Sequence, residues 1–335
     1  MRIAPTIASL ALAALLLSPL SSSAQSFGGI TSSGSPFDIS VSPQFPSPHE
    51  SATLSFTSAT INLADATLKI NVDGKDFYAG NVRPVAIPLG GAGNVASVIV
   101  TVTSNGTSES RTVQVQPEDV TLVAEPVASA PPLYPGKPEV PIQGDVRVVA
   151  MADLRNAAGG RISPSSCSYT WTVDEERVDE ASGIGKDSIL VASPLQYRAR
   201  NVSVTVESQD GSLVGGATIS IIPEESTMRI YRDDPLLGIL FDHALSGSYA
   251  IQGSEDTLYA APFSLPTTGG LPTIQWSLNG AAAQTGPTIT LRPSGEGQGG
   301  AALAVTASVS SLLQATANLS LSFNTSQGGF NLFGL

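Results

Sequence analysis

The chain has 335 residues, a net charge of −12 and 13% charged residues, about half the charged share of an average soluble protein. The hydrophobic fraction of 41% is enough for packed cores and argues against disorder. The acidic balance, with no basic cluster, argues against nucleic acid and anionic membranes as partners. A single cysteine, Cys167, excludes an intrachain disulfide, and two histidines, His49 and His243, leave little for a metal site or a catalytic triad.

The first 24 residues have the features of a secretory signal peptide. Met1 and Arg2 give a basic start, residues 7–17 form an uncharged apolar run, and a small-x-small pattern predicts cleavage after Ala24. An uncleaved anchor is the alternative, but the run is shorter than the ~20 residues that span a bilayer. Residues 25–35 are rich in Ser and Gly, which predicts a flexible lead-in. No later stretch could cross a bilayer, so we expect a protein that is secreted or held at the cell surface.

A strand pattern with a central tryptophan recurs along the chain. Tyr169, Trp171 and Val173 alternate with polar residues, as in a half-buried strand. Similar stretches surround Trp276 and Ile70, so the three central residues lie 101 and 105 residues apart. This period predicts three tandem domains of one kind. Cys167 has the parity of Trp171, which predicts a buried and inert thiol.

The repeat divides the chain into domain 1 at residues 36–117, domain 2 at 118–223 and domain 3 at 224–324, followed by an apolar flexible tail at 325–335. Valine-rich strands recur in the first two domains, and hairpin turns are predicted where Asp or Asn precedes Gly, because both turn residues need a positive φ. These turns are at Asp73-Gly74, Asn105-Gly106, Asp210-Gly211 and Asn279-Gly280. Asp174-Glu175 replaces such a pair, so a longer connection is expected there.

Two stretches interrupt this pattern. Residues 126–141 are rich in proline, and an edge segment inside domain 2 is the preferred interpretation over an interdomain linker. Residues 236–241 are the most apolar run after the signal peptide. A partly buried loop or strand is expected there rather than a short helix, because the surrounding pattern is all strand.

The predicted fold is all-β: three tandem Ig-like antiparallel β-sandwich domains after a signal peptide. The tryptophan belongs on the third strand, between two sheets, and Ile70 requires the first core to be filled differently. The junctions at Pro117-Glu118-Asp119 and Pro223-Glu224-Glu225 are short and contain proline. We therefore expect the domains to run end to end as a rod.

The Tyr169-x-Trp171-x-Val173-Asp174 stretch, the valines of residues 202–206 and the Asp210-Gly211 turn resemble the PKD-like and other Ig-like repeats of exported bacterial surface proteins. The resemblance covers nearly all of the mature chain at the level of pattern. The Trp-Asp-Phe-Gly-Asp-Gly run typical of PKD domains is mostly missing after Trp171, so the chain is similar to Ig-like repeats more broadly. The resemblance implies a spacer, an adhesive module or a carbohydrate-associated module rather than an enzyme.

Few residues stand out as sites. An acidic cluster could bind Ca²⁺, but its spacing matches no EF-hand and a solvated loop is the simpler interpretation; its members are Asp174, Glu175, Glu176, Asp179 and Glu180. Asp233-Asp234, just past the second junction, is a second calcium candidate of the same kind. His243 has Ser246 and Ser248 nearby but no nucleophile elbow, so no hydrolase triad is predicted. We predict no catalytic, cofactor-binding or metal-binding residue and no cofactor.

The favoured function is a non-enzymatic exported cell-surface protein, an elongated structural or adhesive rod. The alternative is a glycan- or protein-binding module of a surface assembly. Exposed aromatic residues in loops would favour the alternative, and the candidates are Tyr197, Tyr231, Tyr249 and Tyr259. The apolar tail could also dock on a partner by adding a strand or filling a groove.

Overall fold

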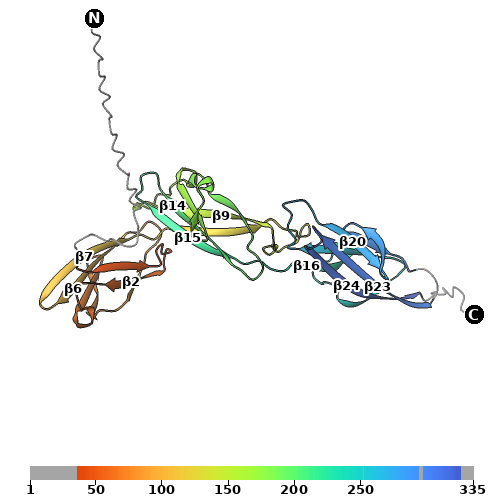
Figure 1. The fold of residues 1–335 in the computed structure, drawn as a ribbon, viewed down its shortest axis with the longest axis horizontal. Coiled ribbons are helices and arrows are strands. Elements are labelled where there is room, and N and C mark those ends of the chain that lie inside the picture. Colours follow the sequence, from red (N-terminus) through yellow and green to blue (C-terminus); the bar gives the residue numbers. More distant parts are fainter. Residues whose placement is uncertain (1–35, 252, 294–296, 326–335) are drawn as a thin grey trace, which may run out of the picture.

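The computed structural model describes residues 36–251, 253–293 and 297–325 (Figure 1). The predicted signal peptide, the lead-in and residues 326–335 of the tail lie outside the described residues. Figure 1 shows three β-sandwiches in a row, here named domains 1, 2 and 3. The described residues contain no α-helix, only three short 3₁₀ turns: η1 (Leu63–Asp65), η2 (Pro164–Ser166) and η3 (Asp179–Ala181).

Domain 1 consists of two antiparallel sheets. The smaller sheet has the order β1-β2-β5 and the larger has the order β4-β3-β6-β7. The strands are β1 (Asp38–Ser42), β2 (Ser51–Thr57), β3 (Thr67–Val72), β4 (Lys75–Asn81), β5 (Val85–Pro88), β6 (Ala96–Ser104) and β7 (Thr107–Val115).

Domain 2 repeats this arrangement with the orders β13-β9-β8 and β11-β10-β14-β15, and β12 pairs with β10 outside that path. Its strands are β8 (Asp119–Pro126), β9 (Asp145–Asp153), β10 (Ser168–Val173), β11 (Glu176–Arg177), β12 (Gly183–Ile184), β13 (Ser188–Ala192), β14 (Arg200–Glu207) and β15 (Val214–Ile221).

Domain 3 has the orders β17-β16-β19-β22 and β18-β24-β23-β20-β21. Parallel pairing of β18 with β24 is the exception among otherwise antiparallel strand pairs of the described chain. The last strand, β24, runs one residue into the predicted tail. The strands are β16 (Thr227–Asp234), β17 (Gly238–Ile239), β18 (Gly247–Ile251), β19 (Asp256–Phe263), β20 (Thr273–Leu278), β21 (Ala281–Thr285), β22 (Thr288–Leu291), β23 (Gly297–Ser308) and β24 (Gln314–Thr325).

Each sandwich encloses one main cluster of buried side chains. Trp171 and Trp276 are fully buried, and their indole N–H groups donate to the carbonyls of Lys186 (2.9 Å) and Gly286 (3.0 Å). These bonds satisfy the one polar atom of each ring, which burial would otherwise leave without a partner. In domain 1 the ring of Phe37 is buried in the same cluster as Ile70. An aromatic residue just before the first strand thus contributes to the core that lacks a tryptophan.

The turn after each core strand is tied to the neighbouring strand by the same pair of hydrogen bonds. Asp73 donates its backbone N–H to the Ser97 carbonyl (2.9 Å), and its carboxylate accepts the Ser97 N–H (2.8 Å). The equivalent pairs are Asp174 with Asn201 (2.8 and 2.9 Å) and Asn279 with Ala302 (2.7 and 2.8 Å). An acidic or amide residue at the first turn position therefore has the same bracing role in all three domains.

The expectation of a longer connection at Asp174-Glu175 is wrong. Val173 pairs directly with Glu176, so these two residues form the whole turn. Glu175 adopts φ 71°, close to the 79° of Gly74 and Gly280 at the equivalent positions. The bonds of Asp174 hold Glu175 in a left-handed conformation that costs an L-residue about 1–2 kcal/mol.

Asp210-Gly211 also differs from its prediction as a hairpin turn. The connection between β14 and β15 spans residues 208–213, and only Gly211 has a positive φ. The Asp210 carboxylate accepts the Ser208 and Ser212 hydroxyls at 2.6 and 2.8 Å, and the Leu213 side chain is buried. A folded loop with its own polar centre therefore replaces the two-residue turn. By contrast, the two-residue turns at Asp-Gly 73–74, Asn-Gly 105–106 and Asn-Gly 279–280 are confirmed by their positive φ values.

The interpretation of the proline-rich stretch as an edge segment of domain 2 is incomplete: Pro126 pairs with Val146 and the Val127 N–H donates to the Asp145 carbonyl (2.9 Å), but the stretch also pairs with domain 3. β8 ends at Pro126, and the following backbone pairs with the loop of residues 264–267 in domain 3. Ser129 donates its N–H to the Leu265 carbonyl (2.7 Å), and Ser264 donates to the Ser129 carbonyl (2.9 Å). Prolines lack the N–H that a sheet position needs. The backbone groups of Ser129, which lies between prolines, therefore have their hydrogen-bond partners in domain 3. We call this contact the 2–3 clamp.

Side chains reinforce the 2–3 clamp. The Tyr134 ring packs edge-on against Phe263 (centroids 4.9 Å apart) and Phe241 (5.8 Å). The Thr268 hydroxyl donates to the Asp145 carboxylate at 2.8 Å. The second junction therefore comprises much more than the predicted Pro-Glu-Glu link, and it restrains domain 3 relative to domain 2.

Candidate interaction surfaces

The four candidate tyrosines have different environments. Tyr197 is 90% exposed, in the loop that joins β13 to β14, with φ 63°. Tyr231 is buried, and Tyr249 and Tyr259 are half-buried. The neighbouring Gln196 donates to the Glu225 carboxylate (2.9 Å), which places this loop at the end of domain 2 nearest domain 3. Of the four rings, only that of Tyr197 is open to a partner.

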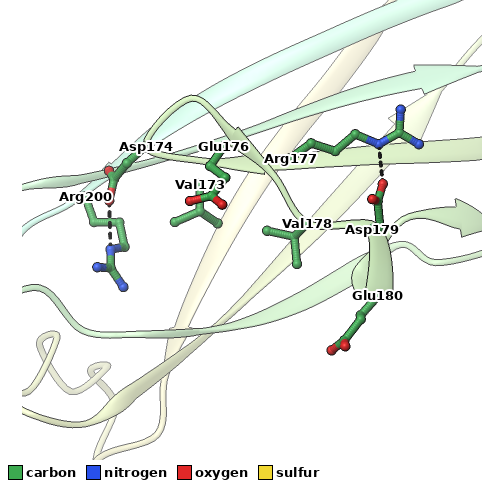
Figure 2. Close-up of a pocket in the computed structure, with 8 residues that line it drawn as sticks. All are labelled: Val173, Asp174, Glu176, Arg177, Val178, Asp179, Glu180 and Arg200. Carbon is green, nitrogen blue, oxygen red and sulfur yellow. Dashed lines mark hydrogen bonds and ion pairs between the residues drawn. The ribbon is translucent and has the colours of Figure 1, made fainter.

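Four of the five residues of the acidic cluster of domain 2, all except Glu175, line an open pocket (Figure 2). Arg200 pairs with Asp174 (3.1 Å) and Arg177 with Asp179 (2.7 Å), so two of its carboxylates already have cationic partners. No three His, Cys, Asp or Glu side chains of the described chain converge as a metal site would require. The geometry gives calcium binding at this loop no support.

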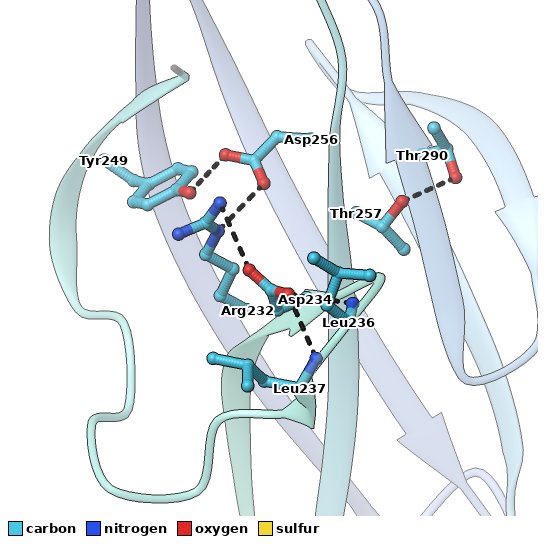
Figure 3. Close-up of polar contacts among 8 residues, drawn as sticks. All are labelled: Arg232, Asp234, Leu236, Leu237, Tyr249, Asp256, Thr257 and Thr290. Atoms are coloured by element: carbon cyan, nitrogen blue, oxygen red, sulfur yellow. Dashed lines mark hydrogen bonds and ion pairs between the residues drawn. The ribbon is translucent and has the colours of Figure 1, made fainter. Parts of the chain in front are cut away.

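The second calcium candidate, Asp233-Asp234, lies at the end of β16 remote from the junction where it was expected, because β16 starts at Thr227 beside the 2–3 clamp. The Asp234 carboxylate accepts the N–H groups of Leu236 (2.9 Å) and Leu237 (3.1 Å), which lower its pKa (Figure 3). Its oxygens are used to hold a turn rather than to face an open ion site.

The buried carboxylate of Asp256 is linked to that turn through Arg232. The Asp256 side chain is 4% exposed and accepts from Arg232 Nε (3.3 Å) and from the Tyr249 hydroxyl (Figure 3). Burial and this bond to Asp256 raise the pKa of Tyr249. Arg232 also approaches Asp234 (3.7 Å), so ion pairs link β16 to β19 and the Tyr249 hydroxyl adds a hydrogen bond from β18.

Neither the histidines nor the cysteine form a catalytic arrangement in the described part of the chain. His243 is exposed, and no hydrogen bond joins it to Ser246 or Ser248. Cys167 is 1% exposed, which confirms the predicted burial, and burial raises the pKa of its thiol. A buried thiol with a raised pKa is a poor nucleophile.

The junction between domains 1 and 2 contains a residue whose burial the sequence did not reveal. Glu118 is 4% exposed, and its Oε2 accepts the Arg155 N–H (2.8 Å) while Oε1 has no partner in the described structure. Burial raises the pKa of Glu118 to about 7, and repulsion from Asp153 adds to the effect. From the sequence alone, a glutamate in a Pro-Glu-Asp link is expected to be solvated. Only the folded structure shows that the carboxyl of Glu118 is enclosed.

Close backbone packing surrounds Glu118. Gly93 donates its N–H to the Pro117 carbonyl (3.0 Å), and its φ is 81°. A Cβ on Gly93 would lie 2.4 Å from the Arg155 carbonyl oxygen. The Gln116 amide spans both domains by donating to the Gly93 and Arg155 carbonyls (3.3 and 3.4 Å). The first junction is therefore tight, polar and dependent on a glycine.

No helix in the described ranges is long and apolar enough to span a membrane. No family model and no curated protein matches the chain. Among solved structures, the chain is similar to a central fibronectin-III array of RIM-binding protein, with 9% identity, TM-score 0.29, and 86% of this chain and 96% of that chain covered.

Two further structures are similar at the same low level. Three N-terminal domains of the bacteriophage RB49 highly immunogenic outer capsid protein share 14% identity, with TM-score 0.23, and 86% of this chain and 98% of that one are covered. Fibronectin(III)-like modules of Clostridium thermocellum CbhA share 11% identity, with TM-score 0.24, and 62% and 94% are covered. Scores this low carry no argument about function, and the assignment of tandem Ig-like sandwiches rests on the strand order described above.

Proposed function

We propose that this chain is an exported bacterial cell-surface protein of the PKD-like or broader Ig-like class, which acts without catalysis as a spacer or display rod. The observation that carries the proposal is the row of three sandwiches, of which the second and third are joined by the 2–3 clamp (Figure 1). A restrained junction resists folding back, which is what a spacer requires.

Small-angle scattering on the mature protein tests the rod. A strand of ~10 residues spans about 33 Å, so three sandwiches with their loops should give a maximum dimension of roughly 100–130 Å. A value near 60 Å, expected for a compact globule of this length, would refute the spacer. N-terminal sequencing of the exported protein should start at Gln25, and a start at Met1 would refute cleavage.

The second candidate function is glycan or protein binding at the end of domain 2 nearest domain 3. It is favoured by Tyr197, because an exposed aromatic ring on a loop can stack on a sugar or enter a protein pocket. A glycan array with the wild type and Tyr197→Ala tests the glycan case. Binding that is lost in Tyr197→Ala supports it, and no binding by the wild type excludes the glycans on the array.

The apolar tail is proposed as a docking peptide that retains the protein on a surface partner. Deleting residues 327–335 should leave the unfolding transition unchanged and reduce retention at the cell surface. Unchanged retention would refute the docking role.

A further inference from the structure

The hairpin of β16 and β17 presents two leucines to solvent. Asp233 pairs with Ile239 and Asp234 with Gly238, so the turn projects beyond the sheet. Leu236 is 92% exposed and Leu237 is 76% exposed. The partly buried strand expected from the sequence is confirmed for the second half of this run, where Ile239, Leu240 and Phe241 are half-buried and Gly238–Ile239 form β17, but the two leucines are exposed. Single exposed leucines are common on protein surfaces, but two adjacent ones at the tip of a held turn form a distinct apolar knob. We call Leu236 and Leu237 the leucine tip.

The leucine tip is pre-organised. Asp234 accepts both leucine N–H groups, and Arg232 connects Asp234 to the buried Asp256 (Figure 3). The described parts of domains 1 and 2 have no counterpart of β17. A turn that is already fixed loses little conformational freedom when it binds.

Domain 1 carries a small apolar hollow that we call the arginine cup. Half-buried Phe56, Leu63 and Val82 line it, and exposed Arg83 lies at its rim. Its volume of about 230 Å³ is below the ~300–1,000 Å³ of small-molecule pockets, so it suits a side chain better than a metabolite.

Arg83 is available to an anion. Its guanidinium lies over the Tyr78 ring (5.1 Å to the centroid), and Nε donates to the Tyr78 hydroxyl (3.2 Å). No carboxylate in the described ranges forms an ion pair with it. An arginine held by an aromatic ring and lacking an acidic partner is a ready contact for a carboxylate.

The tip and the cup lie at opposite ends of the row of domains. β2 ends at the cup, whereas the first junction contacts the start of β6 through Gly93, at the other end of domain 1. β16 starts at Thr227, beside the 2–3 clamp, and ends at Asp234, beside the tip. Domains 1 and 3 lie at opposite ends of the row (Figure 1). One copy therefore cannot fill its own cup, but two copies can meet end to end.

We propose that the leucine tip of one copy docks in the arginine cup of the next, so that the rods associate head to tail. The apolar knob matches the apolar lining, and the half-buried carboxylate of Asp233, at the base of the tip, has the charge that Arg83 of the next copy can contact. The joined surfaces differ, so the contact is heterologous and can repeat along a filament.

The contact is weak because its area is small. A two-residue knob buries far less than the ~1,200 Å² of a stable interface, so association requires high concentration or crowding at a surface. A membrane is the less favoured partner of the leucine tip. A neutral bilayer offers no cationic counterpart to Asp233. Two leucines also bury less apolar surface than a single lipid chain, which by itself gives only marginal membrane binding.

Sedimentation velocity of the mature protein over a concentration series up to about 1 mM tests the proposal. The wild type should show a sedimentation coefficient that rises with concentration. The Leu236→Ser/Leu237→Ser double variant and Arg83→Glu should each weaken association at least roughly tenfold. Adding Asp233→Lys to Arg83→Glu should restore it.

The matched control is Leu271→Ser/Leu312→Ser, which removes two leucines that are 87% and 85% exposed on other loops of domain 3; it should associate like the wild type. A photo-crosslinker at Leu237 should capture the peptide that contains Arg83. A wild type that stays monomeric, tip variants that associate normally, or crosslinks to another surface would overturn the proposal. So would tip-dependent binding to neutral phosphatidylcholine vesicles without self-association, which would make the bilayer the occupant.

Discussion

Replacing Glu118 with Gln should remove a pH dependence from the junction between domains 1 and 2. The substitution keeps the shape of the side chain and the oxygen that accepts the Arg155 N–H at 2.8 Å. It removes a carboxyl that is 4% exposed, has one oxygen without a partner in the described structure, and lies near Asp153.

The magnitude follows from the pKa of Glu118. The value in the folded protein, about 7, exceeds the ordinary 4.5 by about 2.5, which corresponds to about 3 kcal/mol at ~1.4 kcal/mol per pH unit. Because the folded pKa is raised, the folded state binds the proton more tightly than the unfolded state. Its stabilising contribution is therefore complete below about pH 4.5 and is lost as the pH rises to about 7.

Hydrogen exchange measured by mass spectrometry between pH 5 and pH 8, corrected for the intrinsic rate, is the suitable assay. Peptides that contain the amides of Gly93 and Arg155 should lose protection in the wild type as the pH rises, and Glu118→Gln should keep it. Asp119→Asn, which neutralises the exposed neighbour, is the control and should behave like the wild type. Equal loss of protection in the wild type and Glu118→Gln would show that the buried carboxyl does not govern the junction.

Three further substitutions test the packing and the turns. Trp171→Ala should destabilise domain 2 by roughly 3–5 kcal/mol, whereas Trp171→Phe should cost less because it mainly loses the bond to the Lys186 carbonyl. Urea unfolding followed by circular dichroism distinguishes the two variants, and the fluorescence of Trp276 in domain 3 serves as the reference that should not change. Glu175→Gly should stabilise domain 2 by about 1 kcal/mol, because glycine accepts φ 71° without strain, and an unchanged midpoint would contradict this. Gly93→Ala should open the first junction to limited proteolysis while circular dichroism stays unchanged, and continued resistance to the protease would contradict the predicted clash with the Arg155 carbonyl.

The sandwiches were predictable because their signals are local. In an extended strand, alternate side chains share a face, so the parity of Cys167, Tyr169 and Trp171 predicted that all three are buried together, as the structure confirms. Asp-Gly and Asn-Gly turns are equally local, since the φ angles they need depend on the two residues themselves.

The contacts between domains were not predictable by the same reasoning. Prolines in residues 126–141 show where a strand cannot continue, but no local pattern connects Ser129 with Ser264 and Leu265, more than a hundred residues away. The two-residue turn at Asp174-Glu175 was missed for a related reason. A glutamate by itself disfavours the positive φ that Glu175 adopts. The bonds of Asp174 to Asn201 and Arg200, on another strand, hold Glu175 in this conformation.

The two junctions differ in the chemistry that holds them, although both are short and contain proline. The first relies on a glycine backbone contact and an enclosed carboxyl, so its strength depends on a proton that Glu118 loses near neutral pH. The second relies on paired backbone groups and on the packed rings of Tyr134, Phe263 and Phe241. We therefore expect any bending in response to pH to concentrate at the first junction, with domains 2 and 3 moving together.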